Sequence, residues 1–180
     1  MLLDRAASAL LVVDVQERVA AAIPGFEVVA GRIAALIQGA AVLGVPVVGL
    51  EQNPDGLGHT VPELRKLLAA QAIAPKLSFG CLREPAVAEV LRRLQRSQLV
   101  LAGIETHVCV MQSALTLKEG GWSPFVVADA VGSRRRLDHD TALARLAGSG
   151  VGVLTTEMVL FEWLGRFEGP EARAIIRLVK

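Results

Sequence analysis

Gly103-Ile104-Glu105-Thr106-His107-Val108-Cys109-Val110 is the stretch that decides the fold, because it joins a strand-like segment to a helix-like one. The preceding run, residues 98–102, is apolar and has the length and composition of a buried strand. Thr106 is a typical N-cap residue, and residues 108–119 continue with helix-compatible spacing. Cys109 is therefore predicted in the first turn of a helix, just beyond the carboxyl end of a strand.

This position of Cys109 favours a reactive thiol. Backbone N–H groups and the dipole at a helix N-terminus stabilise an anion, so we expect a lowered thiol pKa and a populated thiolate. Open α/β sheets bind ligands at the carboxyl ends of their strands, where such a thiolate acts as a nucleophile. The alternative interpretation is a cysteine that only fills the core.

Two further polar residues follow apolar runs of strand length. Asp14 comes directly after Ala9–Val13, and an acid that closes a buried strand is costly unless it has a partner. Lys76 ends the short apolar stretch that begins at Ala72. A structural aspartate that fixes a cap or loop, and an exposed lysine at a strand end, are the alternatives. Together with Cys109, the two residues compose an acid, a cation and a nucleophile at three strand ends.

Strand-like and helix-like patterns alternate along the whole chain, which is typical of a parallel sheet with helices on both faces. The sequence therefore predicts a single α/β domain over residues 1–180. The expected strands are Ala9–Val13, Val45–Leu50, Ala72–Lys76, Gln98–Gly103, Phe125–Ala128 and Gly152–Leu154. The expected helices are Val28–Leu43, Pro62–Ala70, Glu84–Arg96, Val108–Glu119, Asp138–Ser149, Glu157–Leu164 and Pro170–Val179.

Composition narrows the class of partner. The chain has 180 residues, is 52% hydrophobic and carries a formal net charge of +1, which is not typical of a disordered or nucleic-acid-binding chain. The one basic run, residues 134–136, is interpreted as a solvated face or a contact for a phosphate-sized anion. We expect no nucleic-acid partner, no membrane partner and a cytoplasmic location, since the apolar runs have strand length and the cysteines are only two.

The three strand-end segments resemble the isochorismatase-like cysteine hydrolases, the superfamily of nicotinamidases and N-carbamoylsarcosine amidohydrolase. The matching motifs are Val12-Val13-Asp14-Val15-Gln16, Lys76-Leu77-Ser78-Phe79 and the stretch 103–110. Residues 51–64, 129–136 and 160–166 further resemble the isochorismatase domain-containing subgroup. The resemblance covers nearly the whole chain and implies a three-layer α/β/α sandwich with a six-stranded parallel sheet in the order 3-2-1-4-5-6.

The resemblance also implies roles for individual residues. Asp14 would be the general base, Lys76 the positioning cation and Cys109 the nucleophile. The family has a cis peptide before the nucleophile's helix, which falls on the Ile104–Glu105 bond. The N–H groups of Glu105 and Cys109 would then form the oxyanion hole.

Other parts of the site are less closely specified. Gln16, Asn53, Phe79 and Trp163 are candidates for the walls of the substrate pocket, with core packing as the alternative for the two aromatic residues. Nicotinamidases bind a metal through an Asp-x-His pair and a further His. Here the only histidines are His59, His107 and His139, which lack ligand spacing, so we expect neither a metal nor another cofactor.

We therefore predict a cysteine-dependent hydrolase that acts on a small amide-like or related carbonyl compound, at a non-peptide C–N bond and through a covalent thioester. The alternative is a redox-active or catalytically silent oligomer of the same fold that binds small molecules. The family forms oligomers, and aromatic residues are enriched at interfaces. The segment that contains Leu160, Phe161 and Trp163, with the helix after it, is the predicted contact of a homo-oligomer.

Overall fold

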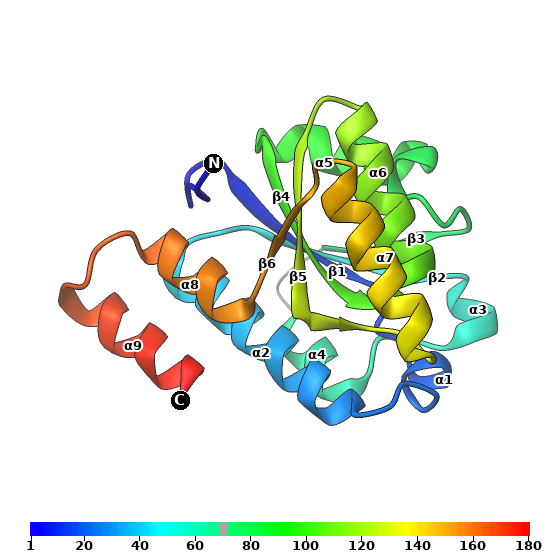
Figure 1. Cartoon of the computed structure of the whole chain (residues 1–180), viewed down its shortest axis with the longest axis horizontal. Helices are drawn as coiled ribbons and strands as arrows, with labels where there is room; N and C mark the ends of the chain where they lie inside the picture. The colour runs from blue at the N-terminus through cyan, green and yellow to red at the C-terminus, as the bar shows by residue number, and fades with distance from the viewer. Residues whose placement is uncertain (69–71) are drawn as a thin grey trace.

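The computed structural model describes residues 1–68 and 72–180, and within these residues the chain forms a parallel six-stranded sheet in the order β3-β2-β1-β4-β5-β6 (Figure 1). The predicted order is confirmed, as is the parallel direction of every strand pair. The strands are β1 (Ser8–Val13), β2 (Val47–Gln52), β3 (Ala72–Lys76), β4 (Gln98–Ile104), β5 (Ser123–Gly132) and β6 (Gly152–Leu154).

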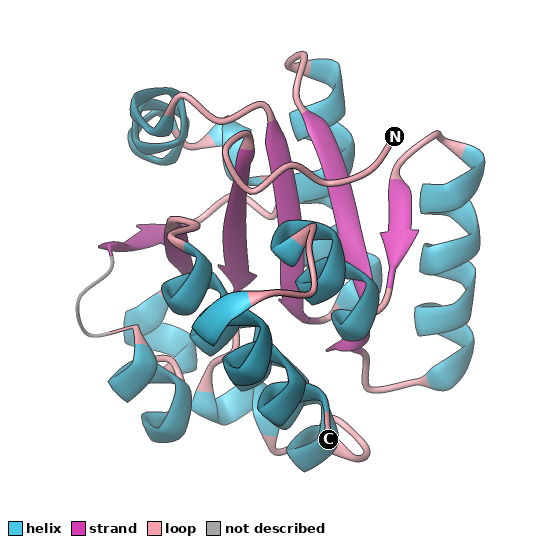
Figure 2. Ribbon diagram, turned by 90° about the vertical axis from the view of Figure 1, so that its left-hand side faces the viewer, coloured by secondary structure: helices cyan, strands magenta, loops and turns pink. Residues whose placement is uncertain are grey.

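Helices cover both faces of this sheet and make the predicted three layers (Figure 2). One layer holds α2 (Phe26–Leu43), α4 (Pro62–Leu67), α8 (Thr156–Leu164) and α9 (Gly169–Val179). The other holds α5 (Pro85–Leu94), α6 (Met111–Glu119) and α7 (Arg136–Gly148). Short helical turns connect them: α1 (Glu17–Ala20), α3 (Pro54–Leu57), η1 (Cys81–Arg83) and η2 (Thr106–Val110).

The sheet separates two apolar cores, and β1 shows why. Its side chains alternate, so Leu10 and Val12 pack toward α2 while Leu11 and Val13 pack toward α6. Every residue of β1 is buried, which a strand between two helical layers requires.

The predicted strands Ala72–Lys76 and Gly152–Leu154 have the observed bounds, and the other strands and helices differ by a few residues at their ends. The short helices α1, α3 and η1 were not predicted. Each has only three or four residues, which is too few for a hydrophobic periodicity to show. The predicted end of the helix at Ala70 lies outside the described residues.

Helix α2 is also the one described helix whose length and composition would suit a membrane span. In the fold it packs on the sheet and against α8 and α9, which accounts for its apolar residues. The sequence predicts this helix as Val28–Leu43, but the expectation that the longest apolar runs have strand length is wrong for it.

The strand order reverses between β1 and β4. Strands β2 and β3 lie on one side of β1, and β5 and β6 lie beyond β4 on the other side. Such a switch point opens a crevice at the carboxyl ends of the two central strands. The backbone is unusual there: Asp14, Asn53 and Glu105, which follow β1, β2 and β4, all have positive φ angles of 54°, 39° and 57°. Strained non-glycine residues cluster at functional sites. The crevice is therefore the candidate active site.

Candidate active site

Asp14 and Lys76 form a buried ion pair at this edge of the sheet. Nζ of Lys76 lies 2.6 Å from Oδ2 of Asp14, and the two side chains are only 0% and 6% exposed. Burial raises the pKa of Asp14 above its ordinary value, while the Lys76 ammonium opposes the rise. A carboxylate with a raised pKa is a better base than a free one. Its other oxygen, Oδ1, is buried and has no hydrogen-bond partner among the described residues.

Lys76 has an acceptor for each of its ammonium hydrogens. Besides Asp14, it donates to Oε1 of Gln52 at 2.6 Å and to the carbonyl oxygen of Ser78 at 3.3 Å. An ammonium with three donors and three acceptors has no free hydrogen for a substrate. Lys76 is therefore a fixed positive charge that holds the acid in place, rather than a proton donor.

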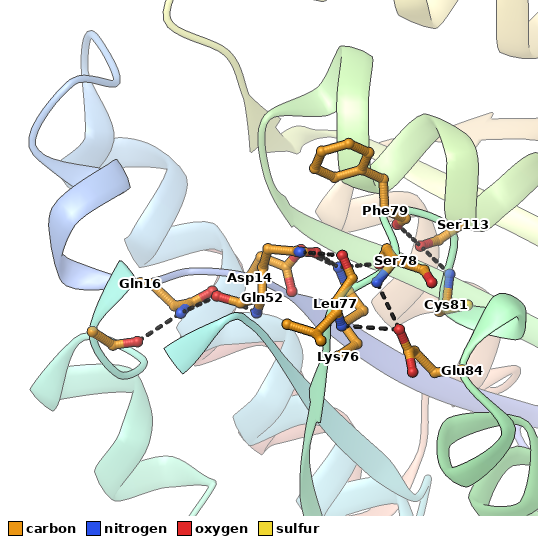
Figure 3. A network of polar contacts seen from close by, with 11 residues as sticks. Asp14, Gln16, Gln52, Lys76, Leu77, Ser78, Phe79, Cys81, Glu84 and Ser113 are labelled. Atoms are coloured by element: carbon orange, nitrogen blue, oxygen red, sulfur yellow. Dashed lines mark hydrogen bonds and ion pairs between the residues drawn. The ribbon is translucent and has the colours of Figure 1, made fainter. Parts of the chain in front are cut away.

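Gln16 does not line the cavity, so its predicted role as a pocket wall is wrong. It holds the backbone of Gln52, the residue that accepts from Lys76. Its side-chain amide donates to the carbonyl oxygens of Gln52 and Gly58 and accepts from the Gln52 N–H (Figure 3). Gln16 lies three residues beyond the end of β1, and its fully buried side chain bonds the backbone at the end of β2. Gln16 thereby ties the end of β2 to the loop that begins at Asn53.

Cys109 reaches the crevice because β4 runs very close to β1. A Cβ at Gly103 would stand 2.1 Å from the carbonyl oxygen of Val13, so only glycine fits at this crossing. Cys109 then lies in η2, the first turn after β4, as predicted. Thr106 is not the N-cap, since its buried hydroxyl pairs with Nδ1 of His139 at 3.0 Å and Glu105 occupies the cap position.

The predicted lowering of the thiol pKa is wrong. Burial raises the pKa of Cys109 far above its ordinary value, and the neighbouring negative charge of Asp14 raises it further. Lys76 lowers it, but its charge is already paired with Asp14 at 2.6 Å. The resting state is therefore a thiol beside a carboxylate, and not a thiolate beside an ammonium.

The Ile104–Glu105 bond is trans, because the described residues contain no cis peptide bond, and this corrects the cis bond predicted from the family. The chain turns into η2 instead through the left-handed conformation of Glu105. The Glu105 carboxylate binds the backbone N–H and the guanidinium of Arg134 at 3.2–3.3 Å, and Nε2 of His107 lies 3.8 Å away. These contacts fix Glu105 where β4, β5 and η2 meet.

A cavity of about 430 Å³ joins these residues. Asp14, Gln52 and Cys109 form its polar floor, and mostly apolar side chains form its walls. Its rim carries two exposed arginines. The remaining lining residues are Arg18, Val19, Ala22, Leu57, Phe79, Ile104, Glu105, Val108 and Arg134.

Two of the predicted wall residues lie elsewhere. Trp163 lies on α8, is 1% exposed and packs in the core shared by the sheet and α2, so it cannot contact a ligand in the cavity. Asn53 is exposed and begins α3, with its side chain beside Gly56 and outside the cavity lining. The local sequence around Trp163 and Asn53 does not indicate whether either side chain faces the cavity.

Phe79 does line the cavity, and a loop of fixed shape presents it. Oε1 of Glu84 accepts from the N–H groups of Leu77 and Ser78, and these bonds hold the pKa of Glu84 below its usual range. The Ser113 hydroxyl bonds the carbonyl oxygen of Phe79 at 3.3 Å (Figure 3). Phe79 itself is 50% exposed, so its ring stands at the mouth of the cavity.

The histidines lie apart from the floor. His59 pairs with the buried carboxylate of Glu51 at 3.0 Å, and burial lowers the pKa of His139. Within residues 1–68 and 72–180, no group of three or more His, Cys, Asp and Glu side chains is arranged to hold a metal ion.

Three residues that line the cavity were not among the predicted site residues: Gln52, Arg18 and Arg134. Gln52 ends β2 and Arg134 follows β5, so the strand-end rule that found Asp14 applies to both. Arg18 sits in a four-residue helix after β1, and no local pattern predicts that this helix reaches the cavity.

Comparison with known proteins now adds to this geometry. The family model of the isochorismatase domain matches residues 8–158, which include all the strands. The chain belongs to the isochorismatase family.

Relatives of this family member include isochorismatase domain-containing protein 1 of Salmo salar, which is 38% identical over 93% of this chain. The chain spans about three fifths of the length of the first curated relatives it matches, with 59% and 62% of them covered.

Two solved structures of this fold are also similar. The MAR1 ribonuclease of Caenorhabditis elegans superposes with a TM-score of 0.93 at 33% identity, covering 99% of this chain and 92% of that one. YcaC of Pseudomonas aeruginosa, determined with hexane-2,5-diol and covalent acrylamide, has a TM-score of 0.91 at 26% identity, with 98% and 91% covered.

Proposed function

We propose that the protein hydrolyses a small amide-like carbonyl compound at a non-peptide C–N bond, with Cys109 as nucleophile and Asp14 as general base. The observation that carries this proposal is the unpartnered, buried Oδ1 of Asp14 in the cavity that Cys109 also lines. A buried acceptor without a donor is costly unless it serves a site. A thiol or substrate proton is the partner that this oxygen lacks.

The first step forms the covalent bond. Because the pKa of the thiol is raised, Cys109 loses its proton only as it attacks, and Oδ1 of Asp14 takes that proton. The sulfur bonds the carbonyl carbon, and the electron pair of the carbonyl double bond moves to oxygen. We propose that the N–H groups of Glu105 and Cys109 stabilise this oxyanion, since both residues line the cavity.

The second step breaks the C–N bond. Asp14 returns the proton to the leaving nitrogen, the carbon–oxygen double bond re-forms, and a thioester remains on Cys109. Asp14 then takes a proton from water, whose oxygen attacks the thioester. The C–S bond breaks, the proton returns to the sulfur, and a carboxylic acid leaves. Lys76 keeps its position throughout because its hydrogens are all bonded to protein groups.

The covalent acrylamide of the P. aeruginosa neighbour supports a nucleophile and a pocket of small-amide size, since acrylamide is an electrophile that nucleophiles attack at its vinyl carbon. Screening small amides, ureides and hydroxamates for ammonia or amine release, with intact mass after acid quench, tests the proposal. We expect turnover and an acyl adduct in the wild type, and a loss of about a thousand-fold or more in both Cys109→Ala and Asp14→Asn.

The control is Cys81→Ala, because Cys81 is a buried core cysteine with its pKa raised to about 11 and does not line the cavity. Its activity should stay close to that of the wild type. Turnover that survives Cys109→Ala would overturn the proposal. A redox protein would instead need Cys109 and tolerate Asp14→Asn, and a silent binding protein would bind amides without any mass shift.

The name of the C. elegans neighbour makes RNA cleavage a further activity to assay. The net charge of +1 and a cavity of about 430 Å³ favour a small molecule instead. We expect no cleavage of single-stranded RNA above the background given by Cys109→Ala.

We also propose that the protein is cytoplasmic and forms a homo-oligomer, in which the outward side chains of the carboxyl-terminal segment make the predicted contact. Leu160 and Trp163 are buried within their own chain, and α9 docks on α2 and α8 through Ala172 and Ile175. Light scattering on the wild type tests the assembly, and a monodisperse monomer would contradict it.

A further inference from the structure

We propose that the substrate carries a carboxylate, and that Arg18 binds it at the rim while the amide carbon lies over Cys109. This inference rests on the proposed function and names its substrate class: a small primary amide of a dicarboxylic acid. The evidence is the set of charged side chains that line the cavity or contact its floor.

Most of these charges neutralise one another. Lys76 pairs with Asp14 at 2.6 Å, and Arg134 pairs with Glu105 at 3.2 Å. Arg18 has no carboxylate within 4.0 Å among the described residues, although Glu17 is its neighbour in the chain. With Asp14 ionised, the site therefore has one unpaired positive charge, and that charge is on the rim.

The guanidinium of Arg18 is nevertheless held in place. Its Nη1 donates to the carbonyl oxygen of Gly56, which ties α1 to α3 beside the cavity. This is the one hydrogen bond of Arg18 within the described residues, and a guanidinium has five donors in a planar fork. The remaining donors suit a carboxylate, which binds such a fork with two parallel hydrogen bonds.

The fork of Arg18 and the reacting groups line the same cavity. Its polar floor holds Asp14 and Cys109, its rim holds Arg18, and apolar side chains such as Val19, Ala22 and Leu57 lie along the walls. A ligand that fits has a polar carbonyl end, a short apolar middle and an anionic end. Arg134 is a weaker anchor for the anion because Glu105 already occupies two of its nitrogens.

Two pairs of matched amides test the proposal: succinamate against butyramide, and glutaramate against pentanamide. Each pair has the same amide and chain length and differs in the carboxylate. We expect the wild type to prefer the anionic member by about ten- to a hundred-fold in kcat/KM, mainly through KM, since charge-assisted hydrogen bonds are the strong ones.

Arg18→Gln should reduce this preference by about ten-fold or more, because the anionic amide loses far more than the neutral one. Arg173→Gln is the matched control, since Arg173 is an exposed arginine of α9 that forms no ion pair with the other described residues and lies outside the cavity lining. Its preference should remain that of the wild type. Equal kcat/KM values within a pair, or equal losses in Arg18→Gln, would overturn the inference and leave the proposed hydrolysis intact.

A binding measurement separates the two proposals where turnover is absent. Calorimetric titration of Cys109→Ala with succinamate and with butyramide should show tighter binding of the anion by about ten-fold, and Arg18→Gln in the same background should remove the difference. Anion-selective binding without turnover in the wild type would overturn the hydrolase and keep the Arg18 site. Binding without selectivity would overturn the Arg18 site.

Discussion

The floor and the rim of the cavity are built in opposite ways. The floor residues Asp14 and Gln52 are 4% and 8% exposed, and both accept hydrogen bonds from Lys76, which is 2% exposed and lies beneath them. On the rim, Arg18, Phe79 and Arg134 are exposed and lie on short helices and loops. Buried polar groups are costly to leave unpaired, so the floor tolerates little change, while the rim can vary without loss of the fold. We therefore expect the proposed chemistry to depend on the floor, and the choice of substrate to depend on the rim.

The largest effect is expected when the floor loses its cation. Lys76→Met leaves Oδ2 of Asp14 and Oε1 of Gln52 without their donor, so the free energy of unfolding should fall by about 3–5 kcal/mol. Urea unfolding measures it. Lys66→Met is the control, because Lys66 is an exposed lysine of α4 and its loss should cost less than about 0.5 kcal/mol.

A second variant distinguishes the loss of charge pairing from a general loss of packing. Asp14→Asn combined with Lys76→Met removes both charges, so it should be more stable than Lys76→Met alone. If Lys76→Met unfolds at the same urea concentration as Lys66→Met, the floor is not the rigid unit described above.

The second effect concerns the pH at which the thiol reacts. In a Cys81→Ala background, iodoacetamide should modify Cys109 with a midpoint above the free-cysteine value of about 8.5, because burial and Asp14 raise the thiol pKa. Below that midpoint the thiol keeps its proton, so the modification rate should fall by about ten-fold for each unit of pH.

Asp14→Asn removes the neighbouring negative charge, so its midpoint should be lower than that of the parent. Lys76→Met removes the positive charge and should shift the midpoint upward. A midpoint below the free value in the parent would contradict the raised pKa and restore the thiolate that the sequence predicts.

The smallest effect is expected at the rim. Glu84→Gln weakens the two N–H bonds that shape the loop carrying Phe79, so KM for the preferred amide should rise by about two- to five-fold with little change in stability. Glu89→Gln is the control, since Glu89 is exposed on α5 and, within the part of the chain that the structure describes, pairs with Arg93 alone. A loss of stability as large as that of Lys76→Met would mean that rim and floor are one unit.

Local pattern located Asp14, Lys76 and Cys109 because each follows or ends an apolar strand, and the fold brings those strand ends to one crevice. The same rule was not applied to Gln52. Trp163 shows its limit: an aromatic residue near the chain end has the same sequence pattern whether it faces a pocket or a core. The cis bond expected from the family is likewise absent from the described residues, where Glu105 makes the turn with a positive φ.

The sequence by itself determined the alternation of strands and helices and the polar residues at the strand ends, because periodicity and propensity are local properties. Only the tertiary structure decided what those residues do to one another. Asp14 and Lys76 are 62 residues apart in the chain and meet at 2.6 Å only when β1, β2 and β3 lie side by side. That pairing uses the positive charge that would have lowered the thiol pKa, and burial then raises it. A pKa depends on distances and solvent access, which exist only in the folded chain.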